Sequence, residues 1–212
     1  MRITVFGAAG TVGGHTVAEA LDRGHSVTAV VRSAARTADL PDRARARVGD
    51  AADPADVAEL SRGGDVVISA TRPAPGREHE LAATAESLLE GTARTGVRLL
   101  LVGGAATLAV PGTGGTAVVD EPGFPEELRP IAHACADQLA VCRRDVAADW
   151  TYLSPPALLD AGERTGRYRL GGDELLVGAD GASRISAADL AVVLLDEAEH
   201  PRHRRMRFTA AY

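Results

Sequence analysis

The chain has 212 residues, of which 45% are hydrophobic and 25% are charged, which is ordinary for a folded globular protein. A formal net charge of −6 argues against binding to nucleic acid, which requires a basic surface. No apolar run approaches the roughly 20 residues of a membrane-spanning helix, and the first strand begins without a signal peptide, so we expect a cytoplasmic protein that does not bind membranes.

An apolar strand, Arg2–Phe6, leads directly into a loop with glycine at every third position. A helix pattern follows from Thr11 to Arg23. The spacing G-x-x-G-x-x-G differs from the usual G-x-G-x-x-G fingerprint, but a strand before the loop and a helix after it favour a seat for a dinucleotide pyrophosphate. To this loop we assign Gly7, Ala9, Gly10, Thr11, Val12 and Gly13.

Strands and helices alternate along the rest of the chain. The expected strands are Ser26–Val31, Ala46–Val48, Asp65–Ala70, Val97–Val102, Trp150–Ser154 and Arg204–Thr209. The expected helices run over 54–60 after an Asp53 N-cap, over 78–95, over 130–148, and from a Ser186 cap to about Glu199. This alternation predicts an α/β fold, a Rossmann-type doubly wound parallel sheet in a single domain over residues 1–212.

Two irregular segments follow strands in the second half of the chain. Residues 104–129 are rich in Gly and Pro, and a segment of this length without periodicity is typical of a lid or binding loop. Residues 157–183 contain short pieces, with a hairpin expected around Tyr168–Leu176. Because ligands bind at the carboxyl ends of strands in this architecture, we expect both segments to lie on the substrate side.

The end of the second strand favours NADP(H) over NAD(H). An NAD-preferring site carries Asp or Glu about 20 residues after the glycines, where it binds the ribose 2′-hydroxyl. Arg32 stands there instead, followed by Ser33 and Arg36, and a guanidinium can hold a 2′-phosphate with two parallel hydrogen bonds. The alternative is that Arg32 is an ordinary surface residue.

Residues at the ends of the later strands complete the expected cofactor site. Asp50 could accept a hydrogen bond from the adenine amine or could hold its own turn, and both roles are compatible. Small residues at the other strand ends allow the cofactor to lie against the backbone. The predicted cofactor residues here are Asp50, Ala51, Ala70, Thr71, Gly103, Gly104 and Pro155.

The chain resembles the atypical branch of the short-chain dehydrogenase/reductase superfamily, in particular NmrA-like proteins and flavin reductases of the biliverdin reductase B type. The motifs that carry this resemblance are GAAGTVG, VVRS, GDAADPADV, ISAT, LLLVGGA, DWTYLSPPAL, TGRY and SRISAADLA, which span nearly the whole chain. The resemblance implies an NAD(P)(H)-binding Rossmann fold. It covers reductases of flavins, quinones and ketones, and also non-catalytic redox sensors.

One departure from the catalytic members of this superfamily is chemically important. Those enzymes use Tyr-x-x-x-Lys on the helix after the fifth strand, whereas this chain contains no lysine and has no tyrosine in that helix. His133 and Asp137 are the candidate acids on the same helix, with solvent as the alternative proton source. The candidate residues of the substrate pocket are Thr107, His133, Pro156 and Tyr168. No group of His and Cys residues has the spacing of a metal site.

These observations predict an NADP(H)-dependent reductase that transfers hydride to a flavin, a quinone or another conjugated carbonyl compound. The alternatives are a non-catalytic NADP(H) sensor that binds a protein partner and, with less support, an NAD(P)-dependent isomerase or epimerase. We expect a small-molecule substrate and a monomer or homodimer.

Overall fold

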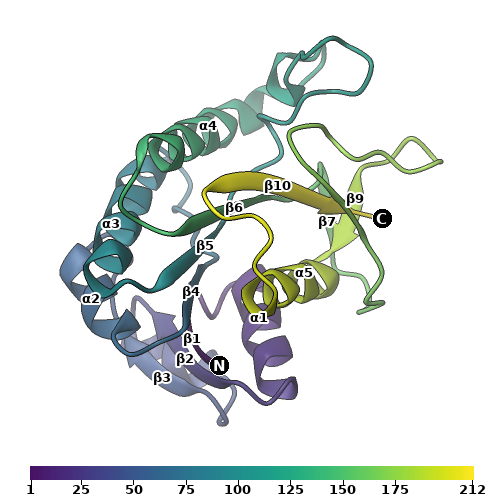
Figure 1. The fold of residues 1–212 in the computed structure, drawn as a ribbon. Coiled ribbons are helices and arrows are strands. Elements are labelled where there is room, and N and C mark those ends of the chain that lie inside the picture. The colour runs from purple at the N-terminus through teal and green to yellow at the C-terminus, as the bar shows by residue number, and fades with distance from the viewer.

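Short apolar runs form the central sheet of the protein, for which a computed structural model describes residues 1–212. Eight strands pair in the order β3-β2-β1-β4-β5-β6-β10-β8, and every neighbouring pair is parallel except β10 with β8. Figure 1 shows the sheet from β3 to β10. Strands that are buried on both faces need continuous apolar side chains, which β4 and β5 provide. The bounds are β1 Arg2–Phe6, β2 Ser26–Val31, β3 Arg45–Val48, β4 Val66–Ser69, β5 Arg98–Val102, β6 Trp150–Ser154, β8 Arg169–Gly171 and β10 Met206–Ala211.

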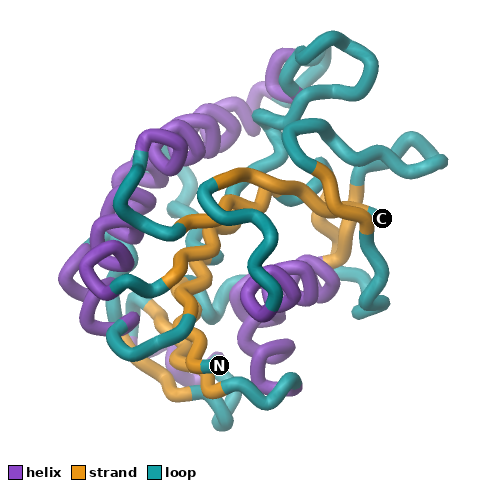
Figure 2. The backbone as a smooth tube through the Cα atoms, in the orientation of Figure 1, coloured by secondary structure: helices purple, strands orange, loops and turns teal.

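Helices cover both faces of this sheet. Helices α1 (Thr11–Asp22) and α5 (Ala187–Glu199) lie on one face, and α2 (Pro54–Ser61), α3 (Glu80–Thr95) and α4 (Arg129–Arg144) lie on the other (Figures 1 and 2). The expected doubly wound Rossmann-type architecture is therefore confirmed. No helix has the length and apolar character that crossing a bilayer would require.

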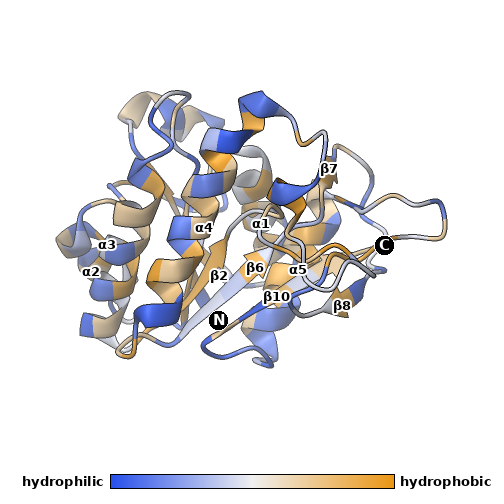
Figure 3. Ribbon diagram, turned by 90° about the horizontal axis from the view of Figure 1, so that it is seen from above, coloured by the Kyte–Doolittle hydropathy of each residue, from blue (hydrophilic) through white to orange (hydrophobic).

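Two hydrophobic layers hold the helices on the sheet. In the first layer Val17 of α1 and Leu194 of α5 pack on one face, and in the second Leu88 of α3 and Leu139 of α4 pack on the other. Figure 3 shows that α3 and α4 carry both hydrophobic and hydrophilic turns, as expected for helices with one face on a core and one in solvent.

Two predicted helix boundaries need correction. Helix α3 begins at Glu80, two residues later than expected, because a turn occupies residues 78–79. Helix α4 ends at Arg144, four residues earlier than expected. The chain leaves the helix at Asp145, whose carboxylate accepts hydrogen bonds from the backbone N–H groups of Ala147 and Ala148. This local side-chain cap competes with continuation of the helix.

The hairpin expected around Tyr168–Leu176 is wrong. Strand β8 pairs with β10 from the end of the chain, and Leu170 lies opposite Ala210. A second, two-stranded sheet forms from β7 (Leu158–Asp160) and β9 (Arg184–Ser186), which the sequence did not reveal. Both pairings join residues far apart in the chain. A strand of three residues is too short for its alternation of apolar and polar side chains to identify the strand with which it pairs.

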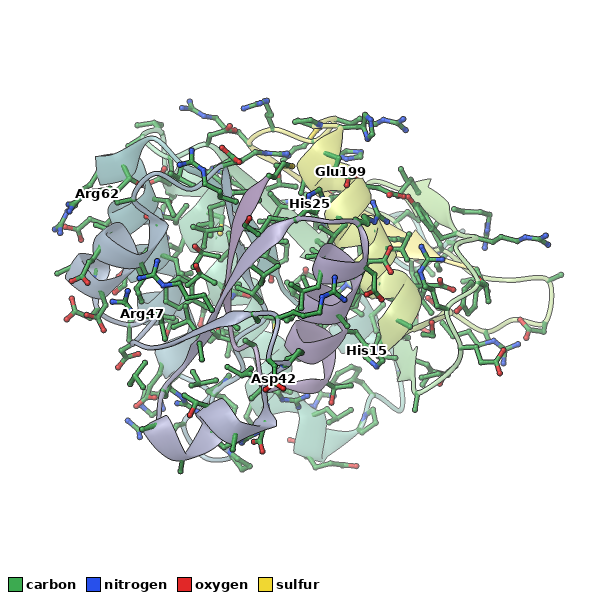
Figure 4. The ribbon with its side chains drawn as sticks, turned by 90° about the horizontal axis from the view of Figure 1, so that it is seen from below. His15, His25, Asp42, Arg47, Arg62 and Glu199 are labelled. Atoms are coloured by element: carbon green, nitrogen blue, oxygen red, sulfur yellow. The ribbon has the colours of Figure 1, made fainter.

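A buried ion pair links the sheet to α5. The guanidinium of Arg98 on β5 pairs with the carboxylate of Glu197 and donates to the Glu197 backbone carbonyl at 2.7 Å. Both side chains are less than one-tenth exposed, and Glu197 also accepts hydrogen bonds from the backbone N–H groups of Arg202 and His203. At the C-terminal end of the same helix, the Glu199 Oε1 atom lies 2.7 Å from His25 Nε2, and Figure 4 shows these two side chains close together.

Candidate functional site

A cleft of about 690 Å³ opens at the carboxyl ends of the strands in the first half of the sheet. Its walls come from the loops after four neighbouring strands. The lining residues include Gly7 after β1, Arg32 after β2, Asp50 after β3 and Thr71 after β4. This edge is where open α/β sheets bind their ligands. The cleft brings together these predicted cofactor residues: Gly7, Ala9, Gly10, Arg32, Ser33, Arg36, Asp50, Ala51, Ala70 and Thr71.

The glycine loop forms the floor of the cleft. Gly7 has φ +78, a left-handed conformation that disfavours other residues, and a Cβ there would lie 2.6 Å from the Ala70 carbonyl oxygen. A Cβ at Gly13 would lie 2.1 Å from the Gly7 carbonyl oxygen, so this glycine lets α1 approach the loop. The backbone geometry therefore favours a residue without a Cβ at both positions.

The start of α1 carries unused hydrogen-bond donors. Gly10 is the N-cap and provides no side-chain cap. The backbone N–H groups of Thr11, Val12 and Gly13 donate to no acceptor in the protein. Three unsatisfied donors at the positive end of a helix dipole are suited to a bound anion.

The residues after β2 differ in how they are engaged. Arg32 is exposed and makes no hydrogen bond or ion pair within the protein, so its guanidinium is available to a ligand. Arg36 pairs with Asp39, at 2.5 Å, and donates to the Ala9 carbonyl at 3.0 Å. Ser33 caps the following 3₁₀ helix by accepting from the backbone of Ala35. Arg32 is thus the residue of this group with a free charge.

The residues after β3 and β4 shape the cleft wall. Asp50 Oδ1 accepts a hydrogen bond from the backbone N–H of Ala52 at 2.9 Å, which is the turn-holding role that the sequence left open. Ala51 is buried, and the hydroxyl of Thr71 lies 3.0 Å from that of Ser69. The Ala70 carbonyl lies against Gly7, and both residues line the cleft.

The predicted residues after β5 and β6 lie at the same edge of the sheet but outside the lining of this cleft. Gly103 donates its backbone N–H to the Leu153 carbonyl, and a Cβ there would collide with the ring of Tyr152. Gly104 lies against Cys135, and Pro155 follows β6 directly. Tyr152 on β6 is fully buried and cannot reach a substrate.

Two candidate substrate residues are engaged within the protein. The Thr107 hydroxyl accepts a hydrogen bond from Arg207 at 2.9 Å. Arg207 also pairs with Asp173 and so joins the two irregular segments, 104–129 and 157–183, to β10. The Tyr168 hydroxyl donates to Asp196 on α5, which directs its side chain to a helix and not to the cleft.

The remaining candidates lie apart from the cleft. His133 and Asp137 are exposed on α4 and make no hydrogen bond within the protein. Pro156 is buried after β6. The roles of these residues stay predictions. The segment 104–129, predicted as a lid, is held to the segment 157–183 by backbone hydrogen bonds from Ala109 to the Asp173 carbonyl and from Leu175 to the Ala109 carbonyl.

Sequence reasoning missed two arginines in the cleft, Arg72 and Arg77. Arg77 pairs with Glu80 at the start of α3. Arg72 is exposed and makes no ion pair or hydrogen bond. Its position, directly after Thr71 at the end of a central strand, is a signal that could have identified it, because the carboxyl edge of the sheet is the ligand-binding edge.

The cleft fits a dinucleotide on three observations. The glycines leave a cradle that a Cβ would fill, the first turn of α1 presents unsatisfied N–H groups, and Arg32 offers an unpaired cation one strand away. An anionic ligand of extended shape would satisfy all three features.

Comparisons with known proteins agree with this geometry. A family model described as NAD(P)H-binding matches residues 7–201. The uncharacterized protein YwnB of Bacillus subtilis is 39% identical over 217 residues, covering 99% of this chain and 97% of that protein. The structure of a proposed epimerase from Bacteroides thetaiotaomicron is 36% identical in sequence. The match covers 100% of this chain and 96% of that chain, with a TM-score of 0.90. A proposed NADH-flavin reductase from Streptococcus pneumoniae is 35% identical, with 100% and 99% coverage and a TM-score of 0.86.

Proposed function

The chain belongs to the NAD(P)H-binding family, and we propose that it is an NADP(H)-dependent reductase that transfers hydride to a flavin, a quinone or another conjugated carbonyl compound. The observation that carries the proposal is the cleft whose lining includes Gly10, the residue that begins α1 with its unsatisfied N–H groups, and the unpaired guanidinium of Arg32. The Streptococcus relative named as an NADH-flavin reductase supports the choice of acceptor class.

Different residues in and around the cleft would bind different parts of the cofactor. The N–H groups of Thr11, Val12 and Gly13 would bind the pyrophosphate, and Arg32 would bind the 2′-phosphate with paired hydrogen bonds. The turns after β5 and β6 would flank the nicotinamide. The segments 104–129 and 157–183, which Arg207 holds together, would border the acceptor.

When bound, the reduced nicotinamide supplies the hydride. The cleft lining contains no tyrosine, histidine, cysteine or lysine that could act as a proton donor. This composition favours acceptors whose reduction leaves a delocalised anion, because such an anion can take its proton from water. The protein's contribution would be to position the acceptor, and positioning alone can lower a barrier by about 7 to 11 kcal/mol in well-oriented systems.

Direct binding measurements on wild-type protein and Arg32→Ala test the cofactor assignment. We expect the substitution to weaken NADPH binding about tenfold to a hundredfold, the range for loss of a charged hydrogen-bond partner, and to change NADH binding little. Arg62→Ala is the matched control, because Arg62 is also exposed and unpaired and lies at the end of α2. Equal losses of NADPH and NADH affinity in Arg32→Ala would refute the 2′-phosphate assignment.

The absence of a Tyr-x-x-x-Lys pair also favours a second candidate, a non-catalytic NADP(H) sensor. A sensor would bind NADPH and NADP⁺ with different affinities and would oxidise no acceptor. An isomerase or epimerase needs an acid and a base on opposite faces of its substrate. The two carboxylates of the cleft are instead engaged within the protein, Asp50 with Ala52 and Glu80 with Arg77.

A further inference from the structure

Arg72 is an unexplained charge at the acceptor side of the cleft. The lining contains four arginines, and two of them are held by partners: Arg36 by Asp39, and Arg77 by Glu80. Arg32 and Arg72 have no partner in the protein. Arg32 is accounted for by the proposed 2′-phosphate contact, so Arg72 is the cation that remains.

The positions of the two free arginines differ along the sheet. Arg32 follows β2 and Arg72 follows β4, with β1 and its glycine loop between them. Because neighbouring strands lie about 4.8 Å apart, the two strand ends are separated by about 10 Å. A dinucleotide with its adenosine half at Arg32 and its pyrophosphate at the start of α1 would therefore extend its nicotinamide half toward β4, where Arg72 lies.

Arg72 also lies toward the turn after β5. Burial raises the pKa of the Cys135 thiol to about 11, and the positive charge of Arg72 acts on the same pKa in the opposite direction. Cys135 lies directly against Gly104, since a Cβ on that glycine would be 2.8 Å from its sulfur. Because Arg72 follows β4, which pairs with β5, its loop lies next to the Gly103–Gly104 turn after β5, beside which the nicotinamide and the acceptor are proposed to lie.

We infer that Arg72 binds the negative charge that hydride transfer creates on the acceptor, which makes it a catalytic residue of the proposed reductase. This inference rests on the proposed function. The transfer breaks the C–H bond at the nicotinamide C4 and moves the hydrogen with both bonding electrons to the acceptor, so that NADPH becomes NADP⁺ and the neutral acceptor becomes a monoanion. Water then supplies one proton. A guanidinium beside the acceptor stabilises the anion before that proton arrives.

The inference specifies the class of acceptor. The reduced acceptor must carry its charge on a carbonyl-type oxygen or a ring nitrogen that a planar guanidinium can contact, as in quinones, flavins and conjugated ketones. A compound whose reduction leaves a localised alkoxide would also need a proton donor, and the cleft lining has no tyrosine, histidine, cysteine or lysine to supply the proton. Simple ketones and aldehydes are therefore expected to be poor acceptors.

The test compares two naphthoquinones that differ in charge, measured by direct binding in the presence of saturating NADP⁺. The 2-hydroxy-1,4-naphthoquinone is an anion at neutral pH and mimics the charged product, whereas 2-methyl-1,4-naphthoquinone is neutral. The variants are Arg72→Met and, as a control with the same loss of charge, Arg62→Met, whose side chain is exposed and unpaired and lies at the edge of the molecule (Figure 4).

We expect Arg72→Met to weaken binding of the anionic quinone about tenfold or more, the effect of losing one charged hydrogen bond, and to leave the neutral quinone and NADPH within about twofold. The rate with the neutral quinone should fall through kcat and not KM, and Arg72→Lys should recover part of it. Arg62→Met should change none of these values.

Two results would overturn the inference. The first is a loss of NADPH affinity in Arg72→Met with unchanged binding of the anionic quinone, which would make Arg72 a cofactor ligand. The second is unchanged binding of all three ligands. Failure of the proposed function is distinguishable, because it would appear in the wild-type protein as an absence of NADPH binding or of hydride transfer.

Discussion

Substituting Gly13 by alanine tests the closeness of α1 to the glycine loop. A Cβ at this position would lie 2.1 Å from the carbonyl oxygen of Gly7 and 2.7 Å from its carbonyl carbon. Ordinary contacts begin at 3.4 Å, so the helix and the loop must separate by about 1.3 Å. Both atoms belong to the backbone of a loop whose conformation at Gly7, with φ +78, leaves little freedom to adjust.

The expected cost has two opposing parts. Forcing an extra methyl group into a packed contact destabilises a protein by about 1 to 3 kcal/mol. Replacing glycine by alanine inside a helix stabilises it by about 1 kcal/mol. We therefore expect Gly13→Ala to lower the free energy of unfolding by about 0 to 2 kcal/mol. NADPH affinity should fall about tenfold or more, because the displaced N–H groups of α1 lose a charged hydrogen bond to the pyrophosphate.

Gly14 provides the matched control on the same helix. A Cβ there would lie 3.7 Å from the nearest backbone atom, an ordinary contact. Gly14→Ala should therefore keep NADPH affinity and raise the free energy of unfolding by about 0.5 to 1 kcal/mol. Urea unfolding and fluorescence titration with NADPH measure both quantities. If the two variants bind NADPH equally well, the assignment of the glycine loop to the pyrophosphate is refuted.

Three further predictions concern the stability and reactivity of the protein. Glu197→Gln should lower the free energy of unfolding by about 3 to 5 kcal/mol in urea titrations, because it leaves the charge of Arg98 buried without a counter-ion; a change below 1 kcal/mol would contradict this. A hydrogen bond from Arg164, opposed in part by burial, lowers the pKa of Glu19 from 4.5 to about 2, so its ion pairs stabilise the fold fully above pH 4.5 and this contribution is lost as the pH falls toward 2. Unfolding measured from pH 7 to pH 2 should accordingly show a shallower acid decline in Glu19→Gln than in the wild type, and parallel curves would disprove the coupling. Burial raises the pKa of the two cysteine thiols to about 11 and about 12, so a thiol reagent at pH 8 should modify the folded protein far more slowly than the urea-unfolded chain, and equal rates would show that the thiols are accessible.

The first half of the fold could be predicted from the sequence because its signals are local. Gly7 occurs between an apolar strand and a helix, and Gly13 occurs in the first turn of that helix, so their backbone geometry follows from that order. Arg32 follows β2 by one residue, so the topology alone determines that it reaches the ligand-binding edge. These positions depend on strand order and chain direction, which short apolar runs indicate well.

The second half could not be predicted as well because its contacts are long-range. Strand β8 pairs with β10, and Thr107 is held by Arg207, one hundred residues away in the chain. The side chain of Tyr168 is drawn to Asp196 on α5, although its motif suggested the substrate pocket. Arg72 escaped notice because an isolated arginine in a loop rich in proline has no pattern of its own. The position of each of these side chains depends on contacts with residues that are distant in the sequence, so no local pattern indicates it.

The measurement that tests the central claim most directly is hydride transfer by the purified protein. NADPH is mixed with the protein and with FMN, naphthoquinones or conjugated ketones, and the absorbance of the reduced nicotinamide is followed. We predict oxidation of one NADPH for each acceptor reduced, faster with NADPH than with NADH, and lost in Gly13→Ala but kept in Gly14→Ala. Tight binding of NADPH without oxidation by any acceptor of this class would contradict the reductase and identify the protein as a sensor.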